Sequence, residues 1–363
     1  MEGKIKCRPD CLQLRITFNC GQCYRWNIQP DGSWIGVFHH CVWTVKHEND
    51  YLCYKVNGNY KRALTENTNL KDILLKYVKA MNMPERKYVG DNMLLDCLLW
   101  DYFRMFEDLG EHYIRWSKCD PNFREKADKF YGLRMLKQDP EEILFTFICS
   151  SNTTIKRITG MVEKLCSLYG DKISEVNGNS YYDFPDVSKL ANSSVLKELQ
   201  LAKFGYRAAY IVNSASKIME MGGKDWFKKL TSLTYEEAKS EMMKLPGIGE
   251  KVADCICLMG LNHLSAIPVD THVFQISKQY IPELIHKRTV NNCIYKRIGD
   301  HFRNLFGHHA GWAHVVLFCA DLKIHKRTNN NVSEMRKPRN NKKSKIVVSK
   351  YFATKEVLSI MKS

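Results

Sequence analysis

The sequence predicts an α+β protein, in which an N-terminal antiparallel β-sheet domain with helices precedes an all-helical domain. From about residue 12 to 60, polar and apolar residues alternate and β-branched and aromatic types are frequent, as in half-buried strands. From about residue 66 to Leu322 the apolar residues recur mostly at helical spacing. Strands gathered before helices indicate the α+β class.

The predicted strands include residues 12–18 and 42–45, and turn signals at 30–32 and 57–59 separate such runs. Further on, residues 143–149 form a buried apolar segment that meets a polar break, and 155–169 form a second helical run. We also expect helices over 205–219 and 235–245. Thr234 is the expected N-cap of the last one, with Glu237 three residues later as in a capping box.

We divide the chain into residues 1–118, the α+β domain, residues 119–325, the helical domain, and residues 326–363, a basic tail. The tail is dense in Lys, Arg and Asn and poor in large apolar groups, which predicts disorder. Its basic runs predict a nuclear localisation signal or a nonspecific DNA arm, and a merely solvated end is the alternative. We expect a nuclear protein, with the mitochondrion as a second location.

The charge balance points to the class of partner. The chain has 363 residues and a formal net charge of +16. An excess of cations favours a polyanion, because each Lys or Arg set against a phosphate releases a counterion. We expect nucleic acid, with an anionic membrane surface or a solvated surface as alternatives. We expect no membrane span, because no apolar run reaches the roughly 18 residues that one needs.

Residues 245–251, Leu-Pro-Gly-Ile-Gly-Glu-Lys, predict a hairpin that grips a phosphate. Gly247 and Gly249 can adopt positive φ and admit a foreign chain, and the helix that follows points its free N–H groups at the turn. Lys251, Cys255 and Met259 recur every four residues and share one helix face, which predicts a pocket wall. The alternative is that the last two are core residues while Lys251 reaches solvent.

Asp270 follows Lys251 by nineteen positions and precedes a predicted helix, where an Asp is usually an N-cap. An uncharged lysine amine is a good nucleophile toward a sugar anomeric carbon. A nearby carboxylate can stabilise the positive charge that develops on the sugar as the base departs. Both roles of Asp270 are compatible.

Ordered segments along the chain resemble the 8-oxoguanine DNA glycosylase/lyase branch of the helix-hairpin-helix DNA glycosylase superfamily. Besides the hairpin and Pro268-Val269-Asp270, they are Gly21-Gln22-Cys23-Tyr24-Arg25-Trp26, residues 147–152, 157–161, 205–208, 251–259 and Gly311-Trp312-Ala313-His314. The resemblance implies a helix-hairpin-helix glycosylase domain after the sheet domain. It also implies a base-excision repair enzyme that removes 8-oxoguanine, and ring-opened guanine, opposite cytosine.

The resemblance implies a role for each matching position. Lys251 and Asp270 are catalytic, acting through a Schiff base with β-elimination and through stabilisation of an oxocarbenium-like state. The base pocket comprises Gly21, Cys255, Met259, Pro268, His314 and Phe318, with the Gly21 carbonyl accepting the N7–H that guanine lacks. Asn152 and Tyr206 fill and wedge the vacated stack, Arg157 and Arg207 read the orphaned cytosine, and Gly247, Gly249 and His272 contact phosphate.

Two departures from the family pattern affect specificity. His314 stands where the family usually has a Gln that reads the flipped base, and it offers one donor and one acceptor set by its tautomer. The asparagine run of the family is shortened to Asn152-Thr153-Thr154. The alternative role for the two arginines is phosphate contact.

No cofactor is expected, apart from a possible monovalent cation. Only Cys293 and Cys319 follow Asp270, so the iron–sulfur loop of related branches cannot be built there. A monovalent cation at the hairpin carbonyls is implied by the resemblance. The spacing of Cys7, Cys11, Cys20 and Cys23 leaves a zinc site as the alternative to reduced core thiols, and we expect no metal there.

Two other functions remain open at this stage. One is a monofunctional glycosylase in which Asp270 activates water and Lys251 only touches phosphate. The other is a non-catalytic helix-hairpin-helix protein that grips duplex DNA without base release. In each case the expected partner is double-stranded DNA, with oxidised guanine for the enzymes, and the chain is expected to act as a monomer.

Overall fold

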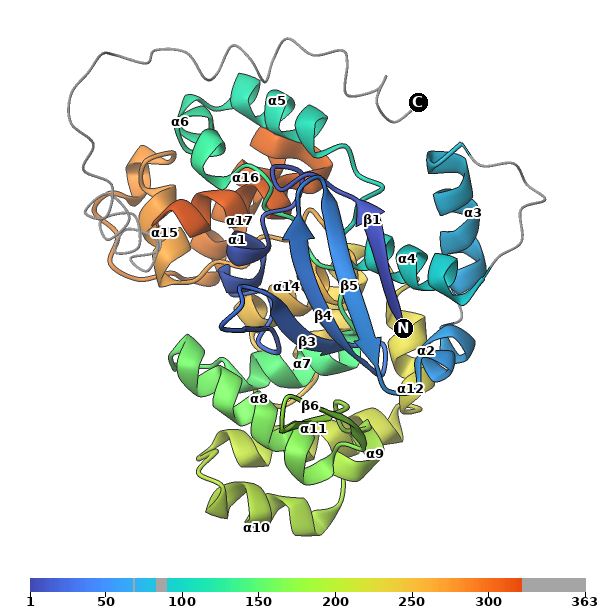
Figure 1. Ribbon diagram of the computed structural model, residues 1–363. Helices are drawn as coiled ribbons and strands as arrows, with labels where there is room; N and C mark the ends of the chain where they lie inside the picture. The colour runs from blue at the N-terminus through green and yellow to red at the C-terminus, as the bar shows by residue number, and fades with distance from the viewer. Residues whose placement is uncertain (68, 83–89, 322–363) are drawn as a thin grey trace.

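The computed structural model describes residues 1–67, 69–82 and 90–321. A five-stranded antiparallel sheet stands at the centre of the view in Figure 1, with helices around it. Its order is β1-β5-β4-β3-β2, and the strands are β1 (Glu2–Lys6), β2 (Asn27–Ile28), β3 (Trp34–Phe38), β4 (Cys41–Glu48) and β5 (Tyr51–Asn57). The predicted antiparallel sheet is confirmed.

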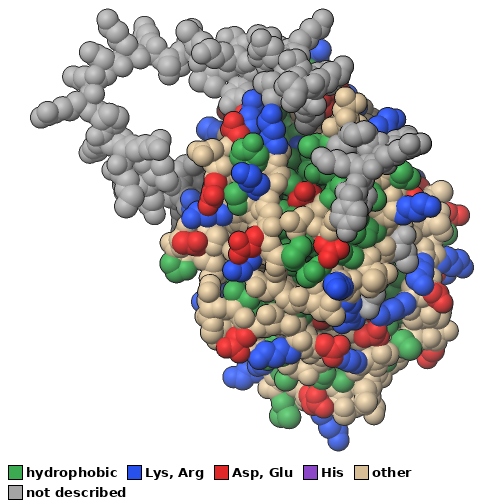
Figure 2. Space-filling model, turned by 45° about the vertical axis from the view of Figure 1, so that its right-hand side comes forward, with side chains coloured by type: hydrophobic (Ala, Val, Ile, Leu, Met, Phe, Trp, Pro, Cys, Tyr) green, Lys and Arg blue, Asp and Glu red, His purple; other side chains and the backbone are tan. Residues whose placement is uncertain are grey.

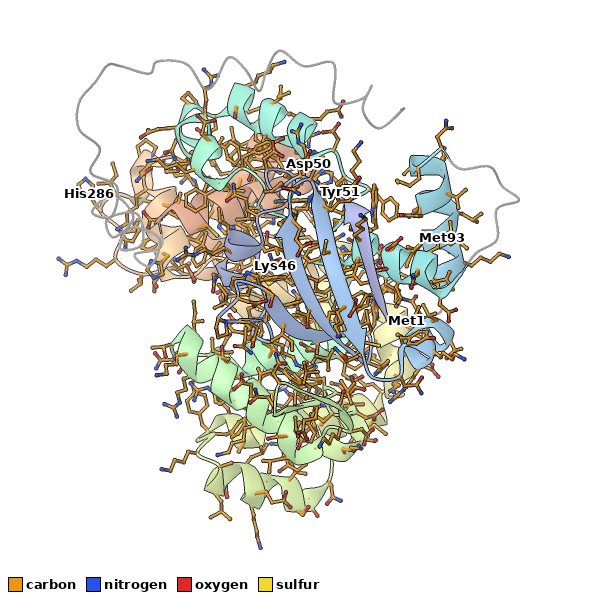
Figure 3. The ribbon with its side chains drawn as sticks, in the orientation of Figure 1. Met1, Lys46, Asp50, Tyr51, Met93 and His286 are labelled. Atoms are coloured by element: carbon orange, nitrogen blue, oxygen red, sulfur yellow. The ribbon has the colours of Figure 1, made fainter. Side chains whose placement is uncertain are left out.

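Tight turns and one terminus fix the sheet. β3 and β4 pair Phe38 with Cys41, and the two residues between them, His39 and His40, both have positive φ, as a two-residue hairpin turn requires. The amino group of Met1 donates to the carbonyl of Val56 at 3.0 Å, which ties the start of the chain to β5 (Figure 3).

One expectation for the sheet is wrong. Residues 12–18 do not form a strand, because α1 (Leu14–Asn19) occupies this segment. Its buried residues are Leu14, Thr17 and Phe18, which are spaced as one face of a helix. The same stretch also alternates, so its period was ambiguous, and packing against the sheet selected the helix. The missing strand comes instead from β1.

The rest of the described chain is helical apart from one hairpin, as expected. The helices beside the sheet are α2 (Tyr60–Glu66), α3 (Leu70–Ala80) and α4 (Asp91–Tyr102). The helical body comprises α5 (Leu109–Cys119), α6 (Pro121–Phe130), α7 (Pro140–Cys149), α8 (Ile155–Tyr169), α9 (Val187–Leu190), α10 (Ser193–Leu201), α11 (Arg207–Glu220), α12 (Lys224–Leu230), α13 (Tyr235–Met243), α14 (Glu250–Met259), α15 (Thr271–Ser277), η1 (Pro282–Leu284), α16 (Asn292–Phe306), η2 (Gly307–His309) and α17 (Ala310–Asp321).

The four predicted helical runs correspond to α7, α8, α11 and α13. The capping box at Thr234 is also confirmed, because its hydroxyl accepts from the Glu237 amide while the Glu237 carboxylate accepts from the Thr234 amide at 2.9 Å. The sequence did not reveal the hairpin of β6 (Lys172–Val176) and β7 (Asn179–Tyr182), which packs on the outer face of the main sheet.

Two apolar cores organise the molecule. One lies between the sheet and α3–α4, and the other fills the helical body from Leu109 onward. The division at residue 118 stays a prediction, and the tail of residues 326–363 lies outside the described residues.

Positive and negative side chains are interspersed on the face shown in Figure 2. Within the described chain, no helix combines the length and apolar character needed to cross a bilayer.

Candidate active site

The predicted hairpin lies between α13 and α14. Gly247 has φ +81°, and a Cβ there would lie 2.5 Å from the ring of Tyr210. Gly249 is the N-cap of α14 with φ −94°, so the expectation of positive φ holds for Gly247 alone. A Cβ at Gly249 would meet nothing within 4 Å. The start of α14 therefore faces open space with its free amides, as a phosphate site needs.

α11 supports this hairpin from behind. The Ser214 hydroxyl donates to the Pro246 carbonyl at 2.9 Å, and the Lys217 ammonium donates to the Lys244 carbonyl at 2.7 Å. Together with the packing of Tyr210 on Gly247, these contacts fix the turn before any DNA is bound. No local pattern in the sequence predicts that α11 would hold the hairpin.

Lys251 lies one residue into α14 and is half-buried. Its Nζ stands 5.4 Å from the centre of the Phe147 ring on α7. In the described part of the chain, no carboxylate lies within ion-pairing distance of this amine. Burial raises the pKa of the Cys255 thiol to about 11. The positive charge of Lys251 lowers this pKa and the negative charge of Asp270 raises it, so both groups lie near the thiol. The three side chains therefore share one site.

Asp270 is the N-cap of α15, as predicted. Its Oδ1 accepts from the amides of His272 and Val273, both at 2.9 Å. Among the described residues, Oδ2 has no hydrogen-bond partner, so one oxygen anchors the side chain and the other remains available. Capping and a catalytic role are thus compatible in this geometry.

A buried hydrogen-bond network connects α14 to the segment before Asp270. Asp254 on α14 is fully buried and accepts from the hydroxyls of Tyr235 and Tyr295, each at 2.6 Å, and from Lys239 at 3.1 Å. Burial raises the pKa of Asp254, and Lys239 opposes this shift. The Tyr295 hydroxyl also accepts from the Val269 amide at 3.1 Å. One hydroxyl therefore fixes the residue before Asp270 relative to the helix of Lys251.

The Gly21 segment is held against α14 by Gln22, a residue that sequence reasoning did not single out. The Gln22 side chain is fully buried, donates to the carbonyls of Thr17 and Arg134, and accepts from the Leu136 amide. Gln138 donates to the Gln22 carbonyl at 2.8 Å through its side chain and to the Met259 carbonyl through its amide.

Gly21 has φ +83°, and its carbonyl accepts a hydrogen bond from the Tyr24 hydroxyl at 3.0 Å. Tyr24 is buried, which raises the pKa of its hydroxyl and keeps it a donor. A carbonyl oxygen has two lone pairs, so Gly21 can still accept one further bond. The Cys255 thiol also raises the pKa of Tyr24, so this hydroxyl lies near Cys255. Because Tyr24 bonds to Gly21, the Gly21 turn borders the same site as Lys251.

The remaining predicted pocket residues come from α17 and the segment before Asp270. His314 is buried, and neither ring nitrogen has a hydrogen-bond partner among the described residues. Burial lowers the pKa of His314 to about 4, with Asp270 opposing the shift, so the ring is neutral near pH 7. Phe318 is half-buried, with its ring 6.1 Å from that of His272, and Pro268 is buried.

The residues predicted to act at the opposite base cluster where α7 meets α8. Asn152 is exposed with φ +47°, a conformation that Asn tolerates better than most residues. Arg207 is buried, bonds the Ser151 carbonyl and lies 3.4 Å from the Asn152 carbonyl. Tyr206 is 51% exposed and donates to Ser151, while Arg157 is exposed and donates to the Lys203 carbonyl. Arg207 thus shapes the loop that carries Asn152.

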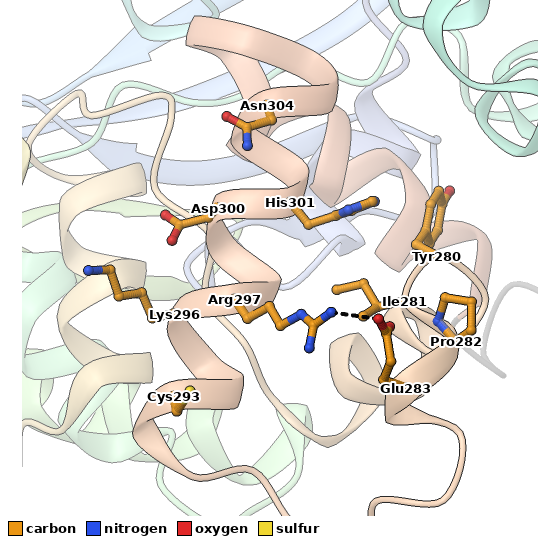
Figure 4. Close-up of a pocket in the computed structure, with 10 residues that line it drawn as sticks. All are labelled: Tyr280, Ile281, Pro282, Glu283, Cys293, Lys296, Arg297, Asp300, His301 and Asn304. Carbon is orange, nitrogen blue, oxygen red and sulfur yellow. Dashed lines mark hydrogen bonds and ion pairs between the residues drawn. The ribbon is translucent and has the colours of Figure 1, made fainter.

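A hollow of about 610 Å³ lies elsewhere, along α16 (Figure 4). Its lining includes Tyr280, Lys296 and the ion pair of Arg297 with Glu283. None of the predicted site residues lines it. The predicted site is instead a junction of α7, α14, α15, α17 and the Gly21 turn.

The four N-terminal cysteines do not assemble into a metal site in the described residues. The one group of close metal-ligating side chains found there contains no cysteine. The Cys20 thiol instead donates to the Thr17 carbonyl at 3.2 Å, and burial raises the pKa of Cys7 to about 12.

Comparison with known proteins identifies the family. Residues 4–144 match the 8-oxoguanine DNA glycosylase N-terminal domain, and residues 145–286 match the HhH-GPD superfamily of base excision DNA repair proteins. The chain is 39% identical over 231 residues to the N-glycosylase/DNA lyase OGG1 of Arabidopsis thaliana, covering 63% of this chain and 62% of that relative. The match thus spans less than two thirds of the plant protein.

The N-glycosylase/DNA lyase of Saccharomyces cerevisiae is 30% identical over 351 residues, covering 88% of this chain and 86% of the yeast protein. Among solved structures, the 8-oxoguanine glycosylase/lyase of Clostridium acetobutylicum bound to DNA with cytosine opposite 8-oxoG is similar. Its TM-score is 0.69 at 28% identity, with 91% of this chain and 98% of that chain covered. Both domains and the extent of the yeast match show that the chain belongs to the 8-oxoguanine DNA glycosylase/lyase family of base-excision repair enzymes.

Proposed function

We propose that this enzyme removes 8-oxoguanine, and ring-opened guanine, from opposite cytosine in duplex DNA, with Lys251 as nucleophile and Asp270 as electrostatic partner. The observation that supports this proposal most directly is that Lys251 and Asp270 both lie near the same thiol, that of Cys255. Lys251 has an aromatic ring and a thiol as neighbours and no carboxylate partner in the described residues, so no ion pair has to be broken before attack.

The proposed reaction begins with the target nucleotide flipped out of the duplex. Nζ of Lys251 bonds to C1′ while the bond from C1′ to the base nitrogen breaks, and the base leaves with its electron pair and takes up a proton. The positive charge on the sugar during this step faces Asp270. Ring opening then gives the imine, and loss of a C2′ proton expels the 3′ phosphate by β-elimination.

The proposed base pocket combines a fixed carbonyl with neutral walls. The remaining lone pair of Gly21 would accept the N7–H of 8-oxoguanine, while Cys255 and Phe318 would enclose the base. His314 is buried with both ring nitrogens unpaired, which suits a hydrogen bond to the Watson–Crick edge of the base. Burying these nitrogens without a partner costs free energy that the base would recover.

In this proposal the hairpin and the net positive charge of the chain both contribute to DNA binding. Gly247, Gly249 and His272 would contact phosphate, and Asn152, Tyr206, Arg157 and Arg207 would fill the stack and read cytosine. Residues 322–363 contain twelve Lys and Arg against two Asp and Glu, so they supply +10 of the net +16 and the preceding residues supply +6. The proposal includes this tail as a salt-sensitive DNA or nuclear-import segment, a monovalent cation at the hairpin, and a monomeric enzyme.

Borohydride trapping tests the nucleophile. With an 8-oxoguanine:cytosine duplex we expect a covalent adduct that Lys251→Gln abolishes. Lys278→Gln is a matched control, because Lys278 also lies over a Phe ring, 4.8 Å from the centre of Phe274. Base release without any adduct would indicate a monofunctional enzyme in which Asp270 activates water. DNA binding without base release would remove the enzymatic proposal altogether.

Duplexes with 8-oxoguanine or ring-opened guanine opposite each of the four bases test specificity. We expect faster cleavage opposite cytosine, reduced in Arg157→Gln, because two guanidinium donors match the acceptors of cytosine better than those of adenine. Equal cleavage opposite adenine and cytosine would contradict the proposed roles of Arg157 and Arg207.

A further inference from the structure

Three metal-ligating side chains meet at one point outside the active site. Glu107 lies in the turn between α4 and α5, His112 on α5, and His309 at the end of η2. Oε2 of Glu107 is 3.0 Å from Nε2 of His112 and 3.4 Å from Nε2 of His309. One ligand atom from each residue lies within 4.8 Å of both others, the one such group in the described part of the chain.

We propose that Glu107, His112 and His309 bind a divalent transition-metal ion, with zinc as the best match. Two imidazoles and one carboxylate are a typical ligand set for zinc, and three protein ligands leave one position for water. Ligand bonds of about 2.0–2.2 Å in a tetrahedral centre place neighbouring ligand atoms about 3.3–3.6 Å apart. The two measured separations from Oε2 differ from this range by only a few tenths of an ångström at most.

The surroundings also suit a fixed site. The His112 ring stacks on Trp116, with centroids 5.4 Å apart and planes 19° apart, and lies 5.8 Å from Trp312. The side chains of His112 and His309 are 11% and 13% exposed, so both rings are held by packing, while Glu107 at 36% borders solvent. The rings are therefore pre-positioned and the open coordination position faces water.

The ligand atoms already face one another. A bound ion would replace the contacts that now join Oε2 of Glu107 to Nε2 of each histidine, and each Nε2 would give up its proton to bind the ion. Arg115 lies 3.5 Å from Nδ1 of His112, at the outer limit of a hydrogen bond, and is exposed. Arg115 can turn into solvent when Nδ1 carries the proton of a metal-bound imidazole.

The position of the site gives it a structural consequence. η2 continues directly into α17, the helix that carries His314 and Phe318. In Figure 1, α5 lies close to α16 at one end of the molecule, and the ion would cross-link α5 to the start of α17 there. A metal bound only by the folded state stabilises that state by mass action.

Cobalt titration of the untagged, chelator-treated full-length protein tests the proposal. We expect one equivalent of Co²⁺ with visible d–d bands of nitrogen and oxygen ligation, displaced by Zn²⁺, and a melting temperature that rises with Zn²⁺. His309→Gln and His112→Gln should weaken binding about tenfold or more, as expected for loss of a ligand. His308→Gln is the matched control, because this exposed neighbour lies outside the group, and it should bind like the parent protein.

The wild-type titration decides the matter even if a variant fails to fold. Absence of saturable binding would overturn the proposal, and so would a spectrum dominated by thiolate-to-cobalt charge transfer, which would place the metal on cysteines. Equal affinity in both triad variants and the control would also refute it. Borohydride trapping of Lys251 is an independent measurement, so failure of the repair function would be seen separately.

Discussion

Replacing Tyr295 by Phe removes a single oxygen that connects the two catalytic segments. This hydroxyl donates to Asp254 at 2.6 Å and accepts from the Val269 amide at 3.1 Å, and Tyr295 is only 8% exposed. A hydrogen bond to a charged group contributes about 1.5–3 kcal/mol, and a buried amide left without a partner costs about 1–3 kcal/mol. We expect Tyr295→Phe to lower the free energy of unfolding by about 2.5–6 kcal/mol, the sum of the two contributions.

The same substitution should slow chemistry, because Val269 immediately precedes Asp270. A displacement of about 1 Å at a reacting group can cost on the order of a hundredfold in rate. We therefore expect single-turnover base release, at saturating enzyme and below the melting temperature, to fall by about ten- to a hundredfold. Urea unfolding of the same preparation measures the stability change.

Tyr280→Phe is the matched control for this experiment. The Tyr280 hydroxyl donates to Asp120 at 2.7 Å and accepts from Asn122, so it is another Tyr–Asp link, between α15–η1 and α6. It should lose stability without losing single-turnover rate. If Tyr295→Phe is destabilised yet retains its rate within about twofold, or if both variants slow equally, Tyr295 does not position Asp270.

Three further predictions address the pocket and the hairpin. Tyr24→Phe removes the hydroxyl that holds the Gly21 carbonyl, so cleavage of 8-oxoguanine relative to ring-opened guanine should change while the adduct with Lys251 persists; an unchanged ratio would contradict this positioning. The pKa of His314 is about 4 in the folded protein against 6.5 normally, so stability is complete above pH 6.5 and falls by about 3 kcal/mol as the pH drops to about 4. His314→Gln should flatten that slope in urea unfolding measured between pH 4 and 7. Gly247→Ala should lower the free energy of unfolding by about 1–2 kcal/mol or more, because Gly247 has a φ of +81° and a Cβ there would lie 2.5 Å from the ring of Tyr210. Gly249→Ala should leave stability unchanged, because a Cβ there meets nothing within 4 Å, and should weaken duplex binding. Fluorescence anisotropy measures that binding.

The sequence predicted the fold correctly where one spacing of apolar residues, helical or alternating, dominated a segment. Residues 155–169 repeat at helical spacing along their whole length and form α8, and Thr234 with Glu237 specifies a helix start through contacts three residues apart. Residues 12–18 fit both periods, so only the neighbouring sheet could decide for α1. The β6–β7 hairpin is exposed on one side and short, which left little periodic signal.

The same division applies to the site. Lys251 and Asp270 were found from residue type, spacing and family resemblance, and Asp270 caps its helix through amides two and three residues away. Gln22, Tyr24 and Tyr295 were not found, because their partners are remote or depend on a turn that only packing defines. The burial of Arg207 also arises from contacts with a loop some 55 residues earlier.

The sequence by itself determined the succession of sheet and helices, the hairpin with its lysine and aspartate, and the repair-enzyme family to which they belong. Each of these depends on neighbours along the chain or on segment order. Only the tertiary structure decided that Gly247 and not Gly249 has positive φ, that Tyr295 connects Asp254 to the segment of Asp270, and that Glu107, His112 and His309 meet. Such features join residues far apart in sequence, and their distances are set by how the two cores pack rather than by any local period.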